Sequence, residues 1–152
     1  GLFPAGRLDR NAEGLLLLTN DGDAAHMLLS PARHVEKTYF VRYDGTLAPD
    51  AETRFRNGIA IPADDGDPAC VCMPAELIRA GEHEARVKVT EGRYHQVKRM
   101  IAAVGGHVTY LRRETFGPLT LDADLRPGAY RELLREEITQ IEEIKRKTRR
   151  QT

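Results

Sequence analysis

A short polar segment near the start of the chain holds a residue well suited to chemistry. Gly6-Arg7-Leu8-Asp9 is followed by an apolar run over residues 14–18 and by a turn over residues 19–22. The run is too short for a helix, so we expect Leu15–Leu18 to form a buried strand. A carboxylate on a loop beside such a strand is held rigidly within reach of a substrate. Asp9 is therefore a candidate catalytic residue; the alternative is a turn or helix-cap residue, a common use of Asp beside glycine.

A second segment is rich in bases. Between positions 92 and 113 there is no acid, and the bases are Arg93, Lys98, Arg99, Arg112 and Arg113. The apolar spacing from Val97 to Val104 predicts a helix over residues 94–104, with this stripe toward the core. A helix turns about 100° per residue, which places Lys98 roughly 110° and Arg99 roughly 150° from the centre of the stripe. Lys98 is thus expected to flank the core and enter a cleft, and Arg99 to face outward.

The two segments make chemical sense together. A carboxylate in a cleft shielded from water needs a nearby cation to stay ionised. We therefore expect the Lys98 ammonium within about 4–6 Å of the Asp9 carboxylate. Several bases near a helix N-terminus also suit phosphate groups, although a solvated helix face is the alternative for each of them.

The charge distribution favours a polyanionic partner. The chain has 23 bases and 23 acids, but residues 145–150 hold five bases and the acid-free segment another five. The other segments then hold 13 bases against 23 acids. Two basic patches on an otherwise acidic protein indicate a surface that meets nucleic acid. For residues 145–152 taken alone, a solvated terminal tail is the preferred interpretation.

The remaining patterns predict an α+β fold in one domain of 152 residues. Hairpin-length connections indicate a largely antiparallel or mixed sheet with helices packed on it. Strands are expected at 15–18, 35–43, 59–61, 69–78, 84–90, 108–115 and 119–121. Helices are expected near 21–29, 49–55, 94–104 and 133–147.

Metal and membrane functions find little support. Cys70 and Cys72 lie on one face of an expected strand without a Cys or His pair to complete a zinc set. Asp64, Asp65 and Asp67 lack the alternating spacing of a calcium loop and are interpreted as loop acids. No apolar run reaches the roughly 18 residues of a membrane span, and no signal peptide opens the chain. We expect a cytoplasmic, monomeric protein with no metal and no cofactor.

Four segments, in this order, resemble the pseudouridine synthases that modify ribosomal RNA. The first is Gly6–Asp9 with the leucine run and Asn20-Asp21-Gly22; the others are Glu36-Lys37-Thr38-Tyr39, Arg93–Met100 and Thr120–Leu133. The resemblance implies the catalytic fold of that family and the isomerisation of a specific uridine to pseudouridine. His95–Lys98 and Thr120-Leu121-Asp122 look more like the small-subunit enzyme than its large-subunit relatives, which remain an alternative.

The resemblance also implies roles for individual residues. Asp9 would be the catalytic residue, Lys98 the base that pairs with it, and Tyr39 the ring that packs against the target uracil. The candidates for RNA contacts are Arg7, Arg93, His95, Gln96 and Arg99. The partner would be ribosomal RNA, free or in an assembling small subunit.

The start of the chain departs from the family pattern. Relatives carry a small RNA-binding domain and a first strand before the Asp segment, so we expect a fragment that lacks both. Residues 1–144 would be the catalytic domain and 145–152 a basic tail. Two functions of other classes remain open: a non-catalytic RNA-binding module, and a carboxylate-dependent hydrolase, for which no second carboxylate can be assigned.

Overall fold

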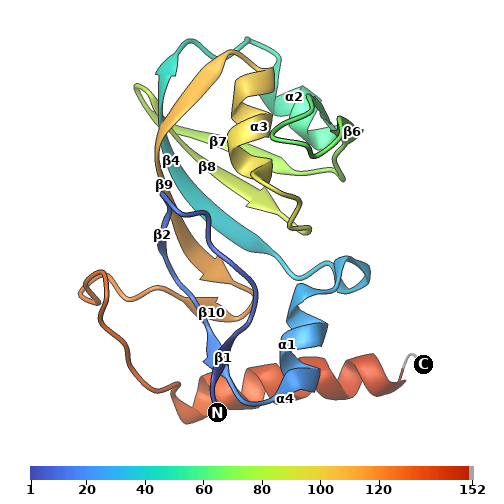
Figure 1. Ribbon diagram of the computed structural model, residues 1–152, viewed down its shortest axis with the longest axis vertical. Helices are drawn as coiled ribbons and strands as arrows, with labels where there is room; N and C mark the ends of the chain where they lie inside the picture. The colour runs from blue at the N-terminus through green and yellow to red at the C-terminus, as the bar shows by residue number, and fades with distance from the viewer. Residues whose placement is uncertain (151–152) are drawn as a thin grey trace.

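The computed structural model describes the backbone of residues 1–150 and the side chains as far as Lys147. A six-stranded sheet forms its centre, in the order β10-β9-β4-β8-β7, with β2 beside β9 (Figure 1). Its strands are β2 (Glu13–Gly14), β4 (Lys37–Gly45), β7 (Glu76–Gly81), β8 (Glu84–Val89), β9 (Gly106–Phe116) and β10 (Leu119–Thr120). β2 runs parallel to β9 and all other neighbours are antiparallel. The predicted mixed α+β architecture is confirmed.

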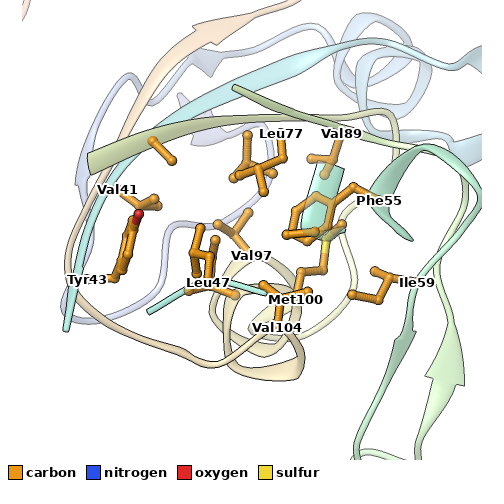
Figure 2. Packing of buried hydrophobic residues seen from close by; sticks show 14 of the residues in the cluster. Val41, Tyr43, Leu47, Phe55, Ile59, Leu77, Val89, Val97, Met100 and Val104 are labelled. Atoms are coloured by element: carbon orange, nitrogen blue, oxygen red, sulfur yellow. The ribbon is translucent and has the colours of Figure 1, made fainter. Parts of the chain in front are cut away.

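Two helices, α2 (Ala51–Arg56) and α3 (Gln96–Ala103), cover one face of the sheet (Figure 1). Figure 2 shows side chains of both helices meeting those of β4, β7 and β8 in the main hydrophobic cluster. Phe55, Met100 and Ile101 are fully buried there. The stripe predicted for α3 is therefore the face that holds this helix on the sheet.

A second hydrophobic cluster lies at the other end of the molecule. It joins α1 (Gly22–Leu29), α4 (Arg135–Arg150) and the last residues of β9. Asp21 caps α1 by accepting a hydrogen bond from the Ala24 backbone N–H, and Lys145 of α4 binds the same carboxylate at 2.7 Å. This ion pair links the two helices, and α4 continues as one helix through residues 144 and 145.

Short elements complete the chain. β1 (Phe3–Pro4) pairs with β3 (Leu18–Thr19), β5 (Ala60–Ile61) pairs with β6 (Cys70–Val71), and a 3-10 turn, η1, spans Pro31–Arg33. Residues 121–134 run without strand or helix. Arg131 ties this segment together through Asp122 and Glu137. Within residues 1–150 no helix is long and apolar enough to cross a membrane.

The prediction of a buried strand over Leu15–Leu18 is wrong. The Leu15 N–H binds the Arg113 carbonyl of β9, whereas the Leu17 carbonyl accepts from Ala5, beside β1. The run thus changes pairing partners within three residues, so it cannot form one continuous ladder. Leu17 is buried, but Leu16 is 40% and Leu18 51% exposed.

The strand expected over residues 69–78 is also divided. β6 ends at Val71 and β7 begins at Glu76, with Pro74 between them. Proline has no N–H to give to a ladder, which explains the break. The Met73 N–H turns instead to the carboxylate of Glu91 at 2.8 Å.

Candidate active site

The loop that carries Asp9 is fixed at both ends. On its N-terminal side the Ala5 N–H binds the Leu17 carbonyl at 2.8 Å. On its C-terminal side Gly14 pairs with Arg113 of β9, with φ +110° and no room for a side chain, because a Cβ would lie 2.2 Å from the Arg113 carbonyl oxygen. Within the loop the Ala12 N–H closes a turn on the Asp9 carbonyl at 2.9 Å.

Lys98 of α3 reaches this loop from the opposite side of the site. Its Nζ lies 3.9 Å from Oδ2 of Asp9, at the short limit of the predicted range. The two side chains are 29% and 26% exposed, so both are partly shielded while remaining open to solvent. The position of Lys98 beside the buried stripe of α3 is what allows it to leave the core and meet the carboxylate.

Tyr94, which the sequence patterns did not single out as a site residue, lies just before α3. Its Oη donates to Oδ2 of Asp65 at 3.1 Å. This hydrogen bond is the main cause of a raised Tyr94 pKa, to which burial and the negative charges of Asp65, Asp64 and Asp9 also contribute. Tyr94 lies just before α3, four residues ahead of Lys98, which links it to the candidate site.

Tyr39 lies on β4, between Val87 of β8 and Arg113 of β9. It is half-buried at the edge of the main cluster, as is Ala12 of the Asp9 loop. Tyr39 makes no hydrogen bond to Asp9 or Lys98 among the described residues. Its part in the site therefore stays a prediction.

The prediction that Arg99 faces outward is wrong. Its side chain is 3% exposed and lies under the loop of residues 62–68, which we call the acidic loop because it holds Asp64, Asp65 and Asp67. The guanidinium donates to the carbonyls of Pro62, Pro68 and Tyr94 at 2.9–3.1 Å, and to Asp67 at 2.8 Å. Arg99 thus joins the acidic loop to the start of α3 and has no surface to offer a phosphate.

Gln96 also turns inward. It is 5% exposed, and its side-chain amide binds Oε1 of Glu91 at 3.0 Å and accepts from the Arg93 N–H at 2.9 Å. A direct RNA contact by Gln96 is not compatible with this arrangement. Its role is to shape the segment before α3, because it links the backbone of Arg93 to a buried carboxylate.

The other RNA-contact candidates lie nearer the surface. Arg7 is exposed on the Asp9 loop, and exposed Arg93 lies 3.2 Å from Glu91, whose charge raises the Arg93 pKa. His95 is 28% exposed and contacts Asp64 through Nδ1 at 3.1 Å. Arg7 lies on the Asp9 loop, and Arg93 and His95 lie in the segment that leads into α3, the helix of Lys98.

Two basic residues near Tyr39 are buried, which the sequence patterns did not reveal. Lys37 is 4% and Arg113 2% exposed, and both stand over the ring of Phe116, at 5.6 and 4.8 Å. Burial, and then the charge of Arg113, lower the Lys37 pKa. Arg113 donates from Nε to the Leu15 carbonyl at 2.8 Å, while its Nη2 has no partner within the described part of the chain.

The site offers no obvious place for a metal. In the described part of the chain no three His, Cys, Asp or Glu side chains are grouped so as to hold one. Cys72 is buried, which together with nearby negative charge raises the pKa of its thiol to about 11.

Comparison with known proteins identifies the family of this chain. The model of the family described as RNA pseudouridylate synthase matches residues 1–103, which include Asp9, Tyr39 and Lys98. The chain belongs to the RNA pseudouridylate synthase family. This confirms the resemblance stated from the sequence.

Individual relatives are similar over most of the chain. Ribosomal small subunit pseudouridine synthase A of Escherichia coli K12 is 45% identical over 140 residues, which are 92% of this chain and 59% of the relative. An uncharacterized RNA pseudouridine synthase of Bacillus subtilis, YtzG, is 44% identical over 143 residues, 93% of this chain and 59% of the relative. A crystal structure of a pseudouridylate synthase superposes with a TM-score of 0.84 at 38% identity, covering 92% of this chain and 59% of that one. The chain therefore spans about six-tenths of the length of these relatives.

In this family member, two supports hold the Asp9–Lys98 pair in place. The Asp9 loop depends on β9 through Gly14 and Arg113, and Lys98 depends on the acidic loop through Arg99, its neighbour on α3. A residue doing chemistry needs such supports, because a displacement of about 1 Å costs a large part of the rate.

Proposed function

We propose that this chain forms the catalytic part of an enzyme that isomerises a uridine of small-subunit ribosomal RNA to pseudouridine. The observation that carries the proposal is the Asp9–Lys98 pair, 3.9 Å apart in a partly shielded site of a family member. The 45% identity to the E. coli small-subunit enzyme supports the choice of target. A large-subunit target is the alternative within the same family.

The reaction rearranges bonds without adding or removing atoms. The bond from ribose C1′ to uracil N1 breaks, the base turns, and a new bond forms from C1′ to C5. The C5 proton is lost and N1 gains one, so uridine and pseudouridine have the same composition and oxidation state. The chemistry therefore has no need of a redox cofactor.

Each residue has a physical task in this scheme. Asp9 acts as an anion, whether it attacks the sugar, attacks the base or removes a sugar proton. Lys98 supplies the positive charge that stabilises the anion in a partly dry site. Tyr39 offers a flat face to the freed uracil. Because the reacting atoms lie in a stacked base, the nucleotide must first be flipped out of its strand.

RNA would be held by basic side chains on the Asp9 loop and just before α3, of which two are exposed and one is partly exposed. Arg7, Arg93 and His95 are the residues we assign to RNA contacts, which position the strand without reading its sequence. Residues 1–144 would form the catalytic domain and residues 145–152 a basic tail. We further propose that the protein is a monomer acting on ribosomal RNA, free or in an assembling subunit, in the cytoplasm and without a metal or cofactor.

The direct test is to incubate ribosomal RNA of both subunits with the 152-residue chain, and with the longest natural protein that contains it, and to map pseudouridine chemically. One new pseudouridine in small-subunit RNA supports the proposal, whereas a new site in large-subunit RNA supports the alternative. RNA binding without any pseudouridine would favour a binding module. A binding module also predicts that Asp9→Ala weakens RNA binding. The enzyme predicts an unchanged or higher affinity, because the variant has lost an anion that faces a polyanion.

A further inference from the structure

Two aromatic side chains form a stacked pair next to the Asp9–Lys98 site. The rings of Tyr94 and His95 have centroids 3.8 Å apart and planes inclined by 21°. The pair precedes α3, the helix that carries Lys98. Tyr94 is 43% exposed, so a large part of its ring meets solvent while one face is covered by the imidazole.

The backbone and three hydrogen-bonding partners hold the pair in place. His95 has a left-handed backbone, φ +48° and ψ +34°, which is uncommon for a residue other than glycine. Asp65 accepts from the Tyr94 hydroxyl and Asp64 contacts the imidazole, both at 3.1 Å. The Tyr94 carbonyl accepts from Arg99 at 2.9 Å. An exposed ring held from so many sides is preorganised.

The acidic loop argues against phosphate as the ligand. Asp64 and Asp65 lie at the polar edges of the two rings, and Asp67 neutralises Arg99 behind them. A phosphate placed on the pair would face these carboxylates. An uncharged flat group would not, and stacking on an aromatic face is how single-stranded nucleic acid is held independently of its charge.

We propose that the Tyr94–His95 pair stacks with a nucleobase of RNA that neighbours the target uridine. This inference rests on the proposed function, which supplies the flipped-out uridine. Once that uridine leaves its strand, the adjacent base loses a stacking partner, and an aromatic ring at the rim of the site replaces it. The pair directly precedes α3, whose Lys98 lies 3.9 Å from the Asp9 carboxylate, and this places the platform close to the reacting nucleotide.

The test uses single-stranded RNA oligonucleotides that carry the target uridine and a fluorescent 2-aminopurine on its 5′ or 3′ side. Binding and quenching are measured in an Asp9→Asn background, where no product forms. Tyr94→Ala should weaken binding roughly tenfold or more and abolish the quenching at one of the two positions. Tyr94→Phe keeps the ring and should bind within about twofold of the parent. Tyr130→Ala is the matched control, because Tyr130 is 88% exposed and lies in the segment between β10 and α4.

A second readout separates stacking from a merely structural role. If the ring stacks on a base, Tyr94→Ala should lower the affinity by the same factor at low and high salt, since no counterion is released. Tyr94→Leu, which fills space without a flat ring, should be as defective as Tyr94→Ala; it also carries the test if the alanine variant fails to fold.

Three results would overturn the inference: parental affinity and quenching for both Tyr94→Ala and Tyr94→Leu, a Tyr94→Phe variant as defective as Tyr94→Ala, or a loss that disappears at high salt. The second result would assign the effect to the hydroxyl and its bond to Asp65 rather than to the ring. Because quenching is measured without turnover, these results are independent of whether pseudouridine is formed. Failure of the platform and failure of the proposed function can therefore be told apart.

Discussion

The Lys98 ammonium lies 3.9 Å from the Asp9 carboxylate, whereas the Lys145 ammonium lies only 2.7 Å from that of Asp21. The shorter pair is a hydrogen-bonded link between two helices. The longer one provides positive charge without occupying the carboxylate oxygens with a close hydrogen bond. Asp9 thus has a cation beside it and remains free to approach a substrate, which is what a reacting carboxylate requires.

Replacing Lys98 by Gln removes this charge and should lower the rate of isomerisation about 100-fold, or nearly 3 kcal/mol of barrier. The matched control is Lys88→Gln, because Lys88 also lies 3.9 Å from a carboxylate, that of Glu76 on β7. The control should retain the parental rate. Single-turnover measurements with saturating RNA distinguish the chemical step from binding, and equal rates for both variants would refute the role of Lys98.

Arg99→Met should destabilise the fold by about 3 kcal/mol, because it removes a buried guanidinium that donates to two carbonyls and one carboxylate of the acidic loop. For a chain of this size the loss corresponds to a fall in Tm of roughly 10 °C. Arg99→Lys should rescue little, since one ammonium cannot reproduce a planar guanidinium that spans several acceptors.

Arg42→Met is the control for Arg99, because Arg42 is 56% exposed and its contact with Glu84 is 3.4 Å long. It should change the free energy of unfolding by less than about 1 kcal/mol. A Tm for Arg99→Met within about 2 °C of the control would show that Arg99 is not the anchor of the acidic loop.

Lys37→Met should stabilise the protein by about 1–2 kcal/mol near pH 7, since a buried cation beside Arg113 is replaced by an apolar chain of similar length. The folded-state pKa of Lys37 lies below its ordinary value of 10.5. Between these two values the unfolded chain binds a proton that the folded chain has released, so the parent gains stability as the pH rises through this window. The stability difference between the Met variant and the parent should therefore become smaller as the pH rises.

Chemical denaturation at pH 7 and pH 10 measures this change for Lys37→Met and for the partly exposed control Lys88→Met. A Lys37→Met variant less stable than the parent at pH 7 would mean that interactions of the ammonium in the folded protein outweigh the cost of burying its charge. If the variant is more stable and less active, the charge of Lys37 serves the site rather than the fold.

The affinity for RNA should fall steeply as salt rises, because contacts of Arg and Lys with phosphate release counterions. Arg7→Gln, at the Asp9 loop, should reduce the slope of log affinity against log salt by about 1. Arg146→Gln, near the end of α4, removes one exposed charge as well and should leave the slope nearly unchanged. A slope that falls for Arg146→Gln and stays unchanged for Arg7→Gln would place the RNA on the C-terminal helix.

Much of this arrangement could be predicted from local patterns. The apolar spacing of α3 predicted its buried face, and the same helical count placed Lys98 toward the cleft, where it meets Asp9. The alternation of β4 predicted a strand, which is observed over Lys37–Gly45. These features follow from periods of 3.6 and 2 residues, which the sequence displays directly.

The predictions were wrong where a segment distant in the sequence determines the surroundings of a residue. A helical count puts Arg99 opposite the core stripe but says nothing of a loop that covers that side, and here residues 62–68 do so. The Tyr94–His95 stack depends on a left-handed backbone at a histidine, which no periodicity indicates. In the same way, the leucine run after Gly14 is apolar enough for a strand, and only its change of partners prevents one.

The most direct test of the central claim is the rate at which Asp9→Asn converts uridine to pseudouridine in ribosomal RNA, with Asp124→Asn as the control at an exposed aspartate. The amide keeps the shape of the carboxylate and removes its charge, so the fold should remain intact by circular dichroism. We predict that Asp9→Asn forms no detectable pseudouridine while binding RNA at least as well as the parent. Isomerisation by Asp9→Asn within about tenfold of the parental rate, little more than 1 kcal/mol of barrier, would contradict the account.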